Sequence, residues 1–118
     1  STITSYKDLV VWQKSMELVV NVYRLTLKLP QDERRGLMSQ MRRAAVSVPS
    51  NIAEGYGRQA TGEYRHHLSI SRGSLLELET QLLVCEKVGY LENLQTQPVL
   101  GEIQLISKML GSLINKLR

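Results

Sequence analysis

The chain has 118 residues, of which 42% are apolar and 22% are charged, values typical of one soluble globular domain. Its single cysteine, Cys85, excludes an internal disulfide and a multi-cysteine zinc site, and no apolar run is long enough to span a bilayer. Because no apolar leader stretch precedes the first element, we expect a cytoplasmic protein with Cys85 as a small core residue.

The net charge of +4 is unevenly distributed along the chain. Residues 34–72 contain seven arginines and two glutamates, a net charge of +5, whereas the rest of the chain carries −1. All of the excess positive charge therefore lies in the middle third. It is carried there by arginine, whose planar guanidinium suits the recognition of phosphate groups.

The first predicted helix covers residues 8–29 and ends before Pro30. Two adjacent apolar stripes recur along it at steps of three and four. One contains Leu9, Trp12, Met16, Val19 and Tyr23, and the other contains Val11, Leu18, Val22, Leu25 and Leu29. Together they are wider than one core-facing side requires. We interpret the surplus as a subunit interface and assign Val11, Leu18, Val22 and Leu25 to it.

A polar loop, residues 30–36, precedes the second predicted helix at residues 37–56. Its apolar face contains Met38, Met41, Ala45, Val48 and Ile52. Pro49 lies inside this pattern, and because the period resumes in phase at Ile52 we expect a kink rather than a break. The Gly-Tyr-Gly at residues 55–57 is expected to end the helix in a left-handed turn.

The third predicted helix covers residues 61–88, with Thr61 as its N-cap and Gly89 after its end. A heptad seam is held over three repeats by Tyr64, Leu68, Ser71, Leu75, Leu78, Leu82 and Cys85.

The fourth predicted helix covers residues 96–117, with Thr96 as a cap and Pro98 in the first turn. Its seam contains Val99, Ile103, Ile106, Leu110, Leu113 and Leu117. With no strand-like alternation, residues 1–118 are predicted to form one all-α domain, an antiparallel up-down-up-down four-helix bundle.

Three segments are specific enough to indicate a family: residues 8–14 (DLVVWQK), 39–55 (SQMRRAAVSVPSNIAEG) and 73–82 (GSLLELETQL). They resemble the 23S rRNA intervening-sequence proteins, small four-helix bundles often encoded inside bacterial large-subunit ribosomal RNA genes. The resemblance extends from about Tyr6 to the C-terminus. It implies a homo-oligomer, a ring of five, without catalytic activity. The genomic setting of some members, and their likeness to a bundle protein that assists a reverse transcriptase on RNA, suggest a nucleic-acid role.

Arginines of the second and third helices are the candidate nucleic-acid-binding residues. Five of them are assigned to this role, Arg42, Arg43, Arg58, Arg65 and Arg72. Arg58, Arg65, Arg72, Glu79 and Glu86 recur every seven residues, so the same stripe also fits charge pairing with a neighbouring helix or subunit. Glu54 and Arg58 are spaced to pair, and Arg42 or Arg43 has the alternative of pairing with Glu77 or Glu79. Among the aromatic residues, Tyr56 is expected to be available to a base.

The sequence predicts no enzyme site, metal site or cofactor. His66 and His67 diverge on a helix, and the Gly-rich phosphate loop, the nucleophile elbow and the Glu-x-x-His pairs of di-iron bundles are all missing. No small-molecule substrate or membrane partner is indicated. Two hypotheses remain: a homo-oligomeric bundle that binds RNA or other nucleic acid, and an oligomeric scaffold or protein-interaction module without a nucleic-acid role.

Overall fold

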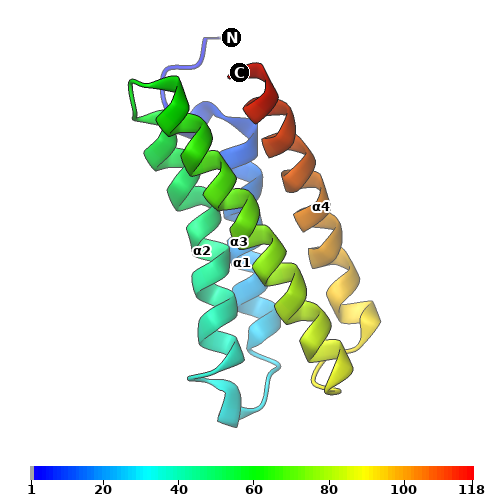
Figure 1. Ribbon diagram of the computed structural model, residues 1–118. Helices are drawn as coiled ribbons and strands as arrows, with labels where there is room; N and C mark the ends of the chain where they lie inside the picture. The colour runs from blue at the N-terminus through cyan, green and yellow to red at the C-terminus, as the bar shows by residue number, and fades with distance from the viewer. Residues whose placement is uncertain (1) are drawn as a thin grey trace.

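The computed structural model describes residues 2–118 as four helices packed side by side (Figure 1). The helices are α1 (Val10–Thr26), α2 (Leu37–Tyr56), α3 (Thr61–Lys87) and α4 (Asn93–Lys116), with short 3-10 turns at Tyr6–Asp8 and Gln31–Glu33. Successive helices run in opposite directions, and each helix contacts two neighbours around a ring in the order α1, α2, α3, α4. The all-α, up-down arrangement predicted from the sequence is therefore confirmed.

The helix boundaries differ from the predicted ones where local caps decide them. Ser5 and Asp8 form a reciprocal capping box around the first 3-10 turn, and this delays α1 to Val10. A second capping box, between Glu92 and Gln95, starts α4 at Asn93, three residues earlier than predicted. Thr96 is therefore not the cap of α4 but a buried residue inside it.

Two further end-of-helix predictions need correction. Thr61 is the first residue of α3, and the N-cap is Ala60, whose side chain has no acceptor. Gly57 does follow the end of α2, but its φ of −75° is right-handed, so it does not form the predicted left-handed turn. The left-handed turn lies after α3 instead, at Gly89, where φ is +86°.

The α2 helix continues through Pro49 without interruption. Pro49 is buried, and beside it Ser71 of α3 donates a hydrogen bond of 2.9 Å to the backbone carbonyl of Val48. This contact ties the two helices together at the proline. The sequence-based expectation that the helix does not break is met, and the kink itself stays a prediction.

The core is formed by the heptad seams expected from the sequence. On α3, every seam residue from Leu68 to Cys85 is buried, and Tyr64 is half-buried. The α4 seam is buried from Val99 to Leu110, and its last two residues are partly covered. Cys85 lies 3.8 Å from the sulfur of Met41, and burial raises the pKa of its thiol. This environment makes Cys85 the core residue that was predicted.

The α2–α3 pair packs most closely because small residues line its seam. Ala44, Ala45 and Gly55 of α2 are buried. A Cβ at Gly55 would stand 2.7 Å from the Cβ of His67. Ser74 donates to the hydroxyl of Ser47 at 2.9 Å across the same seam.

Candidate nucleic-acid interface

The five arginines assigned to nucleic-acid binding do not form one patch. Arg42 and Arg43 lie in the first half of α2, whereas Arg65 lies near the start of the antiparallel α3, at the opposite end of the bundle (Figure 1). With a rise of about 1.5 Å per residue, the 14 residues from Arg42 to the end of α2 correspond to about 21 Å. The structure therefore separates Arg42 and Arg43 on α2 from Arg65 and Arg72 on α3, with Arg58 in the connection between these two helices.

The heptad stripe is shorter than the sequence suggested, because α3 begins at Thr61 and excludes Arg58. The rest of the stripe lies along the seam with α4 of the same chain. Arg65 lines an open groove of about 480 Å³ with Ile114 and Arg118. At the other end of the stripe, Glu86 accepts a hydrogen bond from the neutral hydroxyl of Thr96 of α4. Within residues 2–118, no ion pair joins Arg65, Arg72, Glu79 or Glu86 to another helix, so charge pairing of this stripe stays a prediction.

Arg58 is engaged with its own helix neighbour. Its guanidinium lies 2.9 Å from the carboxylate of Glu54, the pairing predicted from the spacing of four residues. Both side chains are about half exposed, and exposed ion pairs contribute roughly 0.2–1 kcal/mol to stability. Arg58 therefore brings a partly neutralised charge to the surface.

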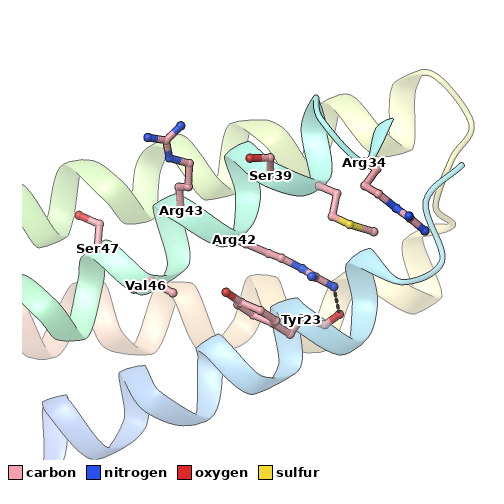
Figure 2. Close-up of a pocket in the computed structure, with 8 residues that line it drawn as sticks. Tyr23, Arg34, Ser39, Arg42, Arg43, Val46 and Ser47 are labelled. Atoms are coloured by element: carbon pink, nitrogen blue, oxygen red, sulfur yellow. Dashed lines mark hydrogen bonds between the residues drawn. The ribbon is translucent and has the colours of Figure 1, made fainter. Parts of the chain in front are cut away.

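Arg42 is held by the last turn of α1, as Figure 2 shows. Its Nε donates to the hydroxyl of Thr26 at 3.0 Å, its Nη2 donates to the carbonyl of Tyr23 at 3.2 Å, and its guanidinium stands 4.3 Å from the centroid of the Tyr23 ring. The carbonyls at the end of a helix lack intrahelical partners and carry partial negative charge, so a cation is stabilised there. Arg42 therefore does not pair with Glu77 or Glu79. Arg43 lines a groove together with Glu77, but within residues 2–118 no carboxylate oxygen lies within 4.0 Å of it.

Arg42 lies in an open groove of about 630 Å³ between α1 and α2. The groove is lined by one residue of α1, one of the connecting loop and six of α2, namely Tyr23, Arg34, Met38, Ser39, Arg42, Arg43, Val46 and Ser47. No carboxylate is among them. Figure 2 shows Arg42 lying between the two helices, whereas the guanidinium of Arg43 points away from α1. A further groove of about 350 Å³, lined by Trp12 and Met16 among others, shares Val46 with this one.

The residues assigned to an oligomer interface are buried inside the chain itself. Val11, Leu18, Val22 and Leu25 are at most 7% exposed, and they belong to the core. The assignment was wrong because it chose between two apolar stripes of α1, and the chosen stripe faces the other helices. The surplus apolar surface lies on the outer side, where Met16, Val20, Tyr23 and Leu27 are exposed by 40–71%.

The contacts of Arg42 with Thr26 and Tyr23 were missed by the sequence analysis. No spacing within one segment signals them, because they depend on how α1 and α2 align across the connection at residues 27–36. The availability of the aromatic residues also differs from expectation. Tyr56 is half-buried and packs edge-on against Tyr64, whereas Tyr23 is 40% exposed.

Within residues 2–118, no group of three or more histidine, cysteine, aspartate or glutamate side chains is arranged to hold a metal ion. His67 contacts Asn51 through its Nδ1 at 3.0 Å, which makes it part of the α2–α3 seam. In the same part of the chain, no helix combines the length and the apolar character that crossing a membrane requires.

Comparisons with known proteins agree with this fold. A family model described as 23S rRNA-intervening sequence protein matches residues 7–112. Among solved structures, a protein of unknown function from the S23 ribosomal protein family of Bacteroides thetaiotaomicron superimposes with a TM-score of 0.78. That protein is 24% identical, and the match covers 89% of this chain and 98% of the other. No functionally curated protein matches the sequence.

Proposed function

Because the chain belongs to the 23S rRNA-intervening sequence protein family, we propose that it is a non-enzymatic, homo-oligomeric helical bundle that binds RNA or another nucleic acid. Its arginines supply the attraction to phosphate groups. Neutralising the phosphate backbone provides most of the sequence-independent affinity of such proteins. The proposal concerns the bundle as a charged surface, and it assigns the chain no reaction.

One observation carries this proposal: the arginines of the middle third are mostly not neutralised within the chain. Within residues 2–118, Arg58 alone of the seven arginines from Arg34 to Arg72 lies within 4.0 Å of a carboxylate oxygen. Arg42 is held by neutral oxygens, which orient its charge without cancelling it. Unpaired charges of one sign on a surface attract a polyanion.

We propose that the protein binds nucleic acid through the attraction of its arginines to phosphate groups rather than by recognising bases. Proteins that read RNA sequence stack unpaired bases on exposed aromatic side chains. Here Tyr56 packs against Tyr64, and the exposed ring of Tyr23 already has the guanidinium of Arg42 near one face. We therefore expect binding with little sequence preference.

The test is the binding of fluorescently labelled single-stranded RNA as salt is raised from about 50 to about 200 mM, a range in which phosphate contacts lose affinity log-linearly. A steep negative slope of log affinity against log salt supports the proposal. Duplex DNA and a scrambled RNA of equal length serve as the specificity controls. If the wild-type protein retains no RNA at low salt, the alternative of a scaffold without a nucleic-acid role replaces it.

The proposed homo-oligomer is supported by the outer side of α1. Val20 and Leu27 are 46% and 71% exposed there, next to Met16 and Tyr23. Apolar residues gathered on one side of a surface helix are typical of a protein–protein contact. The resemblance implies five subunits, so we expect a native mass near five times the 13.4 kDa of the chain.

Native mass spectrometry or light scattering tests the assembly. Leu27→Glu places a charge at an exposed position outside the core and is expected to dissociate the oligomer without unfolding the subunit. Leu76→Glu is the matched control, because Leu76 is 62% exposed on α3, which does not contact α1. A monomeric wild-type protein, or dissociation by Leu76→Glu but not by Leu27→Glu, would remove α1 as the interface.

A further inference from the structure

The α1–α2 groove contains an arginine that is oriented before any ligand arrives. Arg42 is fixed on one side by Thr26 and by the Tyr23 carbonyl, and its guanidinium stands over the Tyr23 ring. Its Nη1 group makes no hydrogen bond within residues 2–118. An exposed arginine normally loses rotamer freedom when it binds, and here the contacts with α1 have already restricted the side chain.

The group that orients Arg42 is itself part of the core. Thr26 is fully buried, and its hydroxyl donates to the carbonyl of Val22 at 2.8 Å while it accepts from Arg42. The hydroxyl hydrogen is therefore directed toward the helix, which leaves an oxygen lone pair for Arg42. The position of the guanidinium thus depends on a rigid part of the bundle rather than on the flexible surface.

The rest of the groove matches an anion in charge and in hydrogen-bonding groups. Arg34 enters from the α1–α2 loop, and Ser39 contributes a hydroxyl from α2. Arg34 is exposed and makes no side-chain hydrogen bond or ion pair within residues 2–118. Since no carboxylate lines the groove, two or more cations face it without compensation. Arginine forks bind phosphate oxygens through paired, charge-assisted hydrogen bonds.

We propose that the α1–α2 groove is a phosphate-binding site in which Arg42, positioned by Thr26, supplies a guanidinium fork and Arg34 a second cation. The phosphate is either a diester of the RNA backbone or a group of a free phosphate compound. The RNA source rests on the function proposed above. The groove itself is tested independently of it.

The first experiment uses inorganic pyrophosphate with the wild-type protein, followed by NMR and compared with sodium chloride at equal ionic strength. A saturable shift of the Arg42 Nε–H signal and of the Ser39 amide is expected. Arg42→Lys keeps the charge but removes the fork, and Thr26→Val keeps the arginine but removes the acceptor that orients it. Both variants are expected to weaken pyrophosphate binding about tenfold or more, as the loss of a hydrogen bond to a charged group does.

The second experiment measures the affinity of the same variants for labelled single-stranded RNA. Arg24→Lys is the matched control, because Arg24 is an exposed arginine of α1 that does not line the groove. Arg34→Gln is the variant least able to disturb folding, because Arg34 lies outside the four α-helices, and it is expected to weaken both ligands several-fold. Circular dichroism confirms that each variant is folded before binding is compared.

The outcomes separate the two proposals. If pyrophosphate shifts the groove signals but the wild-type protein binds no RNA, the groove stands as a site for free phosphate compounds and RNA binding fails. If RNA binds and Arg42→Lys, Thr26→Val and Arg24→Lys behave alike, RNA binding stands and the groove is overturned as the place where RNA binds. The absence of any saturable shift with pyrophosphate also overturns the groove.

Discussion

Replacing Gly55 with alanine tests whether the close approach of α2 and α3 requires a residue without a side chain. The Cβ of an alanine there would stand 2.7 Å from the Cβ of His67, 3.1 Å from Cδ1 of Tyr64 and 3.2 Å from the Tyr64 carbonyl oxygen. The His67 Cβ and the carbonyl belong to parts of α3 that cannot rotate away. The methyl group therefore has to push the two helices apart locally.

The magnitude follows from two opposing contributions. Overpacking of a filled seam costs about 1–3 kcal/mol, whereas alanine in place of glycine in a helix gains about 1 kcal/mol. Gly55 lies one residue before the end of α2, so the gain is at the lower end of its range. We expect Gly55→Ala to lower the free energy of unfolding by about 1–2 kcal/mol.

Urea unfolding followed by circular dichroism measures this change as a shift of the midpoint at constant slope. Gly73→Ala and Gly101→Ala are the matched controls, because each position lies inside a helix and a Cβ there would meet nothing within 4 Å. Both are expected to raise the free energy of unfolding by about 0.5–1 kcal/mol. If Gly55→Ala is stabilised as these controls are, the close-packing argument is refuted.

Three further predictions concern the polar contacts of the bundle. Ser71→Ala removes the hydrogen bond to the Val48 carbonyl and should cost about 1 kcal/mol in urea unfolding; an unchanged midpoint would mean that the carbonyl needs no second donor. Burial raises the pKa of Glu102 above 4.5, and its hydrogen bond with Asn21 opposes this shift. The folded state therefore favours the protonated acid, so the free energy of unfolding falls as the pH rises through the raised pKa. Glu102→Gln should abolish that fall, and a pH profile of the melting temperature that parallels the wild type would contradict the assignment. The hydrogen bond from Tyr90 to Glu33 raises the pKa of the phenol above 10.0, so Glu33→Gln should lower it in an ultraviolet absorbance titration; the burial of Tyr64 keeps its pKa raised and provides the internal control.

The architecture was predictable because α3 and α4 have one apolar face each. The seam from Leu68 to Cys85 steps by four and three without a slip, and its residues are buried as the period requires. On α1 the same reasoning failed, because both stripes are apolar and the period alone cannot say which one meets the other helices. Leu18 and Val22 are fully buried while Val20 is exposed, and the difference comes from the packing of α2 and α4 against α1.

The candidate site was predictable in composition but not in arrangement. The excess of arginine between Arg34 and Arg72 is visible in the sequence. Assigning these arginines to one binding surface was nevertheless wrong, because the helices carry them toward opposite ends of the bundle. The local pairing of Arg58 with Glu54 was found because it depends on a spacing of four within one segment. The contact of Arg42 with Thr26 depends on how two helices are aligned, which no local pattern contains.

The close α2–α3 seam also has a consequence for the order of folding. The two helices are joined by four residues, 57–60, so their contacts close a short loop at little entropic cost. An early hairpin of α2 and α3 is therefore the expected nucleus, with α4 docking later. Substitutions such as Ser71→Ala should then slow refolding, whereas shortening a core side chain of α4, as in Ile103→Ala or Leu110→Ala, should mainly accelerate unfolding. The residues that let these two helices approach so closely would thereby govern how fast the bundle forms as well as how stable it is.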